Sequence, residues 1–100
     1  MNLGSTIKTL RNEKKINQIS LAEMSGITQT YLSQIENNVK EPNISTLRLI
    51  AKNLQTPLPI LFFLSLDDED INPEKKLAYN HLLPSIKSMI SEFFSTSNSK

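Results

Sequence analysis

The sequence predicts an all-α protein in which five short helices are followed by an appended C-terminal amphipathic helix. Three observations favour this fold class. Apolar residues recur at spacings of three and four along most of the chain, capping residues and prolines interrupt the pattern at short intervals, and no useful length of sequence alternates apolar with polar residues. With 100 residues, 38% hydrophobic and 21% charged, the chain is expected to form one domain with a short extra element.

An amphipathic pattern at the start of the chain predicts a first helix over residues 3–14. Leu3, Ile7 and Leu10 recur at helical spacing. A basic stretch over 11–15 follows them, where cations meet the negative end of the helix dipole. We therefore expect the first helix to end close to this basic stretch.

Two capped helix starts in succession predict a pair of helices joined by a tight turn. The second helix is expected over 18–25 and the third over 29–37, and Gly26 gives the turn between them its conformational freedom. Each start has an N-cap, preceded by an apolar residue that can pack on another one inside the helix. These residues are Ile16, Asn17 and Leu21 for the second helix, and Ile27, Thr28 and Leu32 for the third.

Two further helices complete the expected core of residues 1–64. Pro42 and the capping Asn43 open a fourth helix, whose apolar residues are numerous enough to bury most of it. Pro57 suits the first turn of a fifth helix over 56–64, which is almost wholly apolar. Residues 65–71 are acidic and have no periodicity, so we expect them to form a linker.

A sixth helical segment is predicted over 72–94, because Asn72 and Pro73 form a cap followed by proline at the first helical position. Pro84 lies inside this span, which predicts a kink or two short helices. Residues 95–100 are polar and are expected to be a frayed tail. Seven apolar residues form a stripe along the segment: Leu82, Leu83, Ile86, Met89, Ile90, Phe93 and Phe94.

The composition excludes most catalytic and metal sites. The chain has no cysteine, one histidine (His81) and two glycines, so it lacks zinc ligands, the usual acid-base residue and a glycine-rich phosphate loop. We expect no enzyme, no metal, no cofactor and no small-molecule substrate. The longest apolar stretch, 58–66, is far too short to span a membrane, and no secretory signal pattern is present, so a cytoplasmic protein is expected.

The formal net charge of +1 is unevenly distributed. Residues 1–64 carry seven Lys or Arg and four Glu, a net charge of +3, whereas the remainder carries four lysines and six acids, a net charge of −2. A polyanionic partner is therefore expected to meet the first part of the chain.

The stretch from Asn17 to Asn37 resembles the helix-turn-helix of the phage repressor and Cro-like (XRE-type) family of transcriptional regulators. The resemblance extends over residues 3–64 and includes Pro42 and the Leu-rich fourth helix. It implies a compact five-helix, repressor-like domain that places the third helix in the DNA major groove, generally as a dimer on a pseudo-palindromic operator. The matching residues are Gln18, Leu21, Ala22, Gly26, Thr28, Ile35 and Glu36; Lys15 departs from the family, which often has glycine there.

The outward face of the third helix is uncharged and rich in hydrogen-bonding groups. An amide can bond adenine in bidentate fashion and a threonine methyl can touch a thymine methyl, so A·T-containing half-sites are expected. Without the resemblance, an ordinary solvated face is an equally good interpretation. The candidate base-reading residues are Gln29, Thr30, Ser33 and Gln34.

Several polar residues around this helix are candidates for contacts with the DNA backbone. At the start of the second helix, backbone N–H groups and a side-chain amide can hold a phosphate, although Asn17 acting only as a cap is an equally open interpretation. For Tyr31, packing is favoured over a phosphate contact. The candidates are Asn17, Gln18, Thr28, Asn37, Asn38, Lys40 and Asn43.

The resemblance also implies an ion pair between Arg11 and Glu36, which ties the first helix to the end of the third. The predicted function is sequence-specific double-stranded DNA binding by a repressor, with residues 72–94 making a homodimer through their apolar stripe. Packing of that stripe back on its own domain is the alternative for this segment. The alternative is a protein-interaction module such as an antitoxin, with DNA binding secondary. The polar face of the third helix favours DNA, because a helix-in-groove partner needs an apolar stripe there.

Overall fold

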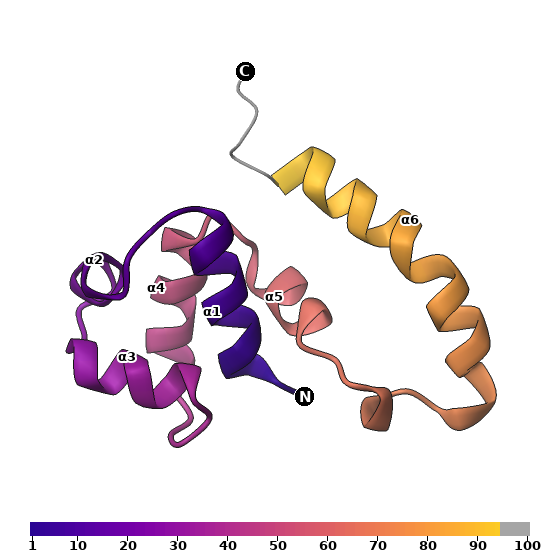
Figure 1. The fold of residues 1–100 in the computed structure, drawn as a ribbon, viewed down its shortest axis with the longest axis horizontal. Helices are drawn as coiled ribbons and strands as arrows, with labels where there is room; N and C mark the ends of the chain where they lie inside the picture. The colour runs from indigo at the N-terminus through magenta and orange to yellow at the C-terminus, as the bar shows by residue number, and fades with distance from the viewer. Residues whose placement is uncertain (95–100) are drawn as a thin grey trace.

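Residues 1–94, which the computed structural model describes, are helical in every regular element (Figure 1). The predicted fraying of 95–100 concerns residues outside this range. The helices are α1 (Leu3–Glu13), α2 (Gln18–Met24), α3 (Gln29–Glu36), α4 (Ile44–Asn53), α5 (Leu58–Leu64) and α6 (Lys76–Phe94), with 3₁₀ turns η1 (Asp68–Asp70) and η2 (Pro73–Lys75) between α5 and α6.

The capping residues place the starts of α2, α3 and α4 where the sequence predicts them. The side chain of Asn17 accepts a hydrogen bond from Ser20 N at 2.8 Å. Thr28 and Asn43 make the same bond to the backbone N–H three residues on, at 3.0 and 2.8 Å. Each cap satisfies one N–H that the first helical turn leaves without a partner.

Three helices end in a residue other than glycine with left-handed backbone. Lys15, Asn38 and Gln55 follow α1, α3 and α4 with φ of 59°, 60° and 54°. This conformation reverses the chain after a helix, and asparagine adopts it more readily than lysine or glutamine. Lys15, the departure from the family pattern, therefore takes the conformation that glycine adopts most easily.

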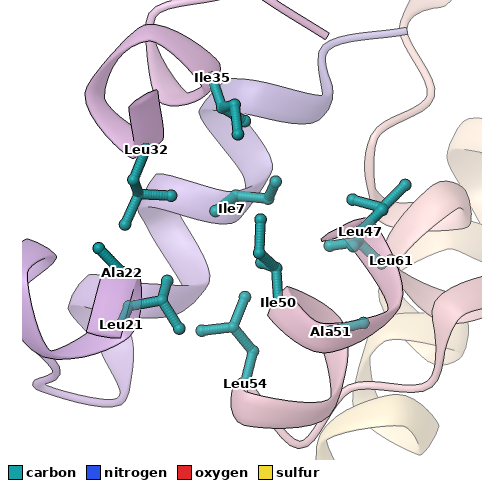
Figure 2. Close-up of a cluster of buried hydrophobic side chains, with 10 residues drawn as sticks. All are labelled: Ile7, Leu21, Ala22, Leu32, Ile35, Leu47, Ile50, Ala51, Leu54 and Leu61. Atoms are coloured by element: carbon teal, nitrogen blue, oxygen red, sulfur yellow. The ribbon is translucent and has the colours of Figure 1, made fainter. Parts of the chain in front are cut away.

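Ten buried apolar side chains from α1 to α5 and their ends form the core (Figure 2). We expected α4 to be mostly buried, yet its Ile44 and Leu49 are 50% and 43% exposed because they lie off the face that carries the core residues of α4. In α5 only Leu61 is fully buried, because α5 covers one edge of the bundle. The core residues are Ile7, Leu21, Ala22, Leu32, Ile35, Leu47, Ile50, Ala51, Leu54 and Leu61.

The expected linker over 65–71 contains a 3₁₀ turn of its own. Together with η2 it connects α5 to α6, and we call residues 65–75 the arm. In η1 the Asp67 backbone N–H donates to the Asp70 carboxylate at 2.8 Å, which closes a capping box. The Met1 amino group lies 2.8 Å from Asp70, and its hydrogen bond lowers the pKa of that carboxyl. Local side-chain bonds of this kind leave no apolar periodicity in the sequence, so the turn was not predicted.

The helix α6 is continuous from Lys76 to Phe94, with Pro84 inside it, rather than split into two short helices. Pro84 is exposed and has no N–H to donate to the carbonyl four residues earlier in the helix. No residue of α6 is fully buried. Tyr79 contacts Phe63 of α5, with ring centroids 6.2 Å apart, and beyond that contact α6 runs beside the bundle (Figure 1).

Candidate nucleic-acid interface

The helix α3 presents an uncharged polar surface at its start. Gln29 and Thr30 are exposed, whereas Leu32 and Ile35 point into the core (Figure 2). Ser33 and Gln34, also predicted to read bases, are half-buried. The first turn of α3 therefore offers the most accessible hydrogen-bonding groups of this helix.

A chain of hydrogen bonds supports this first turn from behind. The Arg11 guanidinium donates to both carboxylate oxygens of Glu36, from Nε at 2.7 Å and from Nη2 at 3.0 Å. Gln18 Nε2 donates to the same carboxylate at 3.1 Å, and Gln29 Nε2 donates to Gln18 Oε1 at 3.3 Å. Four side chains from α1, α2 and α3 thus form one continuous network that ends at Gln29.

The ion pair expected from the resemblance is present and buried. Arg11 is 8% exposed and Glu36 is 4% exposed. Arg11 also donates to the Ile16 carbonyl oxygen at 3.0 Å, which holds the loop between α1 and α2. Two parallel hydrogen bonds from one guanidinium to one carboxylate strengthen the ion pair and also fix the relative orientation of the two side chains. It ties α1, the α1–α2 loop and the end of α3 together.

The predicted backbone-contact residues fall into two groups. Asn17, Thr28 and Asn43 use their side-chain oxygens as caps, so the amide N–H groups of the two asparagines stay free to donate outward. Lys40 and Asn37 are exposed, and Asn37 Nδ2 donates weakly to Ser33 Oγ at 3.5 Å. Tyr31 is half-buried and packs against the core.

Asn38 is exposed, but both ends of its side-chain amide are hydrogen-bonded to residues at the start of α1. Its Oδ1 accepts a hydrogen bond from Gly4 N at 3.2 Å, and its Nδ2 donates to Asn2 Oδ1 at 2.9 Å. The backbone of the following loop is also occupied, because Val39 N and Lys40 N both donate to the Gln34 carbonyl oxygen, at 2.8 and 3.2 Å. Side chains, not these N–H groups, are what this loop offers to a partner.

Sequence reasoning missed Gly4, which brings α1 and α3 together. A Cβ added at this position would overlap the Ile35 carbonyl oxygen and would lie 2.9 Å from that of Glu36. The N-terminal turn of α1 can therefore approach the C-terminal carbonyls of α3 only because residue 4 has no side chain. A single glycine inside a helical pattern carries no sequence signal of such an approach.

Two further features are absent from residues 1–94. Nowhere in this range does a helix combine the length and apolar character needed to cross a membrane. The same residues contain no cluster of three or more His, Cys, Asp or Glu side chains able to hold a metal ion.

Known proteins resemble this chain over the helices just described. The helix-turn-helix family profile matches residues 7–61. The immunity repressor protein of Bacillus phage phi105 is 31% identical over 80 residues, which are 80% of this chain and 53% of the repressor, so this chain spans about half the length of that relative.

Two solved structures extend the likeness. The P22 c2 repressor in complex with a synthetic operator is 33% identical, with a TM-score of 0.58 over 61% of this chain and 92% of that chain. The SinR protein in its complex with the SinI protein is 31% identical, with a TM-score of 0.59 over 91% of this chain and 89% of that chain. The second match extends beyond the residues of the family profile.

Proposed function

Because the chain belongs to the helix-turn-helix family of phage-repressor-like transcription regulators, we propose that it is a dimeric repressor that binds a pseudo-palindromic operator and occludes a promoter. The family consists of DNA-binding regulators and not of enzymes. In this proposal α3 enters the major groove, and α2 and the loop after α3 hold the DNA backbone on either side of it.

The observation that carries the proposal is the exposed start of α3 with its hydrogen-bonded support. Gln29 has an amide that suits adenine, and Gln18 holds that amide from behind. Thr30 lies beside it on the same exposed turn. We assign base reading to Gln29 and Thr30 first, with Ser33 and Gln34 contributing from their half-buried positions.

The backbone contacts are assigned to the polar side chains around α3. Lys40 is exposed and positively charged, and it lies in the loop that follows the reading helix. The side-chain amides of Asn17 and Asn43 remain available as donors beside their capping roles. Gln18, Thr28 and Asn37 complete the set, whereas Asn38 acts by holding α3 against α1.

Dimerisation is assigned to α6. Its Leu82, Met89 and Phe93 are 54%, 58% and 72% exposed, which is more apolar surface than a lone helix is expected to leave in water. A cleft of about 890 Å³, lined by α1 and α5 on one side and by Ile90 and Phe94 on the other, separates α6 from its own bundle. A second copy is the partner that the proposal places on this stripe.

A competing role for α6 comes from the SinR–SinI complex, since SinR is found there with a protein partner. In that case the stripe of α6 receives a different protein and not a second copy. Sedimentation of the pure protein separates the two: a dimer at micromolar concentration supports the proposal, and a monomer favours the heterologous partner.

Selection of bound sequences from a random DNA pool tests the proposal. Gln29→Ala is expected to weaken the best operator by about 1–3 kcal/mol and to relax the preference at one base pair. Lys40→Ala is expected to weaken all sequences alike and to flatten the salt dependence. Lys52→Ala is the matched control, because Lys52 lies beside Leu58 and Phe94, at the side of the bundle that faces α6. If Gln29→Ala changes neither affinity nor preference, α3 is not the reader.

A further inference from the structure

Three helix ends meet at Asn2, the residue that caps α1. Its Oδ1 accepts from Ser5 N at 3.1 Å, which is the cap itself, and from Asn38 Nδ2 at 2.9 Å, which reaches the end of α3. Its backbone N–H donates to the Ser65 carbonyl oxygen at 2.7 Å, at the end of α5. We call Asn2, Asn38 and Ser65 with these bonds the Asn2 junction.

Two neighbours make the junction rigid. The Thr6 hydroxyl lies 3.0 Å from the Asn2 carbonyl oxygen and 3.3 Å from that of Leu64, so it braces the same two helix ends. Gly4 N donates to Asn38 Oδ1 at 3.2 Å, and the absence of a side chain on Gly4 lets α1 approach α3 this closely. The end of α3 and the end of α5 are thereby fixed to one turn of α1.

The junction lies at the root of the arm that carries α6. Ser65 is buried, and its hydroxyl donates to the Leu61 carbonyl oxygen at 2.7 Å, so the chain leaves α5 from a fixed point. Further along, α6 has no fully buried residue, and a cleft separates it from α1. The arm is therefore held at its root, by the Met1 amino group on Asp67 and Asp70 and by the Phe63–Tyr79 contact, rather than by close packing along α6.

We propose that Asn2 is a positioning residue that sets the distance between operator half-sites, by fixing the direction of the arm relative to α3. This inference rests on the proposed dimer. A helix of 19 residues is about 28 Å long, so a rotation of about 7° at the start of α6 moves its far end by about 3.4 Å, the rise of one base pair. A small loosening of the junction is enough to change the preferred spacing.

The test is a selection from DNA in which two copies of the selected half-site are separated by spacers of varied length. The parent protein is expected to enrich one spacing. Asn2→Ala removes both bonds accepted by Oδ1 and is expected to spread enrichment to neighbouring spacings, with a smaller loss of affinity for an isolated half-site, because Asn38 keeps its bond from Gly4 N. Asn2→Asp keeps an acceptor for both bonds and is expected to restore the single spacing.

Asn53→Ala is the matched control for lost stability. Asn53 is partly buried and donates to Ser25 Oγ at 3.2 Å, a bond that joins α4 to the end of α2 and includes no residue of the Asn2 junction or of the arm, so its loss is expected to lower the midpoint of thermal unfolding without changing the spacing. Thr6→Val, which removes the bracing hydroxyl at nearly constant volume, is expected to act like Asn2→Ala.

The outcomes separate this inference from the proposed function. If Asn2→Ala keeps the single spacing of the parent, the junction does not set it and the inference is wrong, although the dimer stands. If the parent enriches isolated half-sites with no fixed spacing, the dimeric operator is wrong and the inference falls with it, although DNA reading by α3 stands.

Discussion

Removing the Arg11 side chain is expected to destabilise the fold far more than it disturbs the DNA-facing surface. Arg11→Ala leaves the Glu36 carboxylate, which is 4% exposed, with Gln18 as its remaining side-chain donor. It also removes the donor that pairs with the Ile16 carbonyl oxygen. Breaking a buried ion pair at one partner costs about 3–5 kcal/mol, because the other charge stays buried without compensation.

This magnitude is large compared with the total stability of a small domain. Free energies of unfolding lie at about 5–15 kcal/mol, so the variant loses about a fifth of the whole or more. Urea denaturation of the parent and of Arg11→Ala measures the difference in their free energies of unfolding, provided that the free energy falls with urea concentration at the same slope in both. A midpoint equal to that of the parent, together with lost operator binding, would place Arg11 at the interface instead of in the scaffold.

A double variant separates two roles of Glu36: its charge in the buried ion pair with Arg11, and the hydrogen bond that orients Gln18. With Arg11→Met and Glu36→Leu no charge remains buried, and such replacements are often neutral or even stabilising by about 1–4 kcal/mol. Gln18, however, loses the carboxylate that orients it. The double variant is therefore expected to recover most of the stability lost in Arg11→Ala, while its preference at the base pair read by Gln29 is weaker than that of the parent.

Three other changes follow from the same contacts. Gly4→Ala is expected to cost more stability than Gly26→Ala, because the new methyl group meets the Ile35 backbone whereas Gly26 has open space and only a left-handed φ of 70°; thermal unfolding of the two variants compares them. A chain that ends at Ile71 is expected to stay folded, to sediment as a monomer and to bind a palindromic operator much more weakly; if it still sediments as a dimer, the contact lies in α1 to α5. Pro84→Ala is expected to stabilise α6 by up to about 3 kcal/mol, and circular dichroism is expected to show helix being lost at a higher temperature.

The helix boundaries were predictable because caps act locally. The second and third helices were expected over 18–25 and 29–37 and are found at Gln18–Met24 and Gln29–Glu36. Their starts depend on one side chain and the N–H three residues on, which a sequence displays directly. The exposure of Ile44 and Leu49 was not predictable from the number of apolar residues in α4, because it depends on which neighbours cover each face.

The supporting contacts of the candidate site were harder to predict. The bond from Gln18 to Glu36 joins side chains from α2 and α3, and its formation requires the packing angle between the two helices. Gly4 and Asn38 meet across 34 residues of sequence, and no local pattern indicates such a contact. Asparagine favours the left-handed backbone found at Asn38, whereas the residue types of Lys15 and Gln55 give no such indication.

The network behind α3 also determines which way the Gln29 amide faces. The Glu36 carboxylate can only accept, so Gln18 must turn its NH₂ group toward Glu36 and its oxygen toward α3. That oxygen in turn accepts from Gln29 Nε2, which leaves Gln29 one amide N–H and its carbonyl oxygen for a partner. One donor beside one acceptor is the pair that adenine N7 and N6 require in the major groove. The charge of Glu36, held by Arg11 in the scaffold, thus orients the amide to which we assign base reading, and this reduces the ordering required when DNA binds.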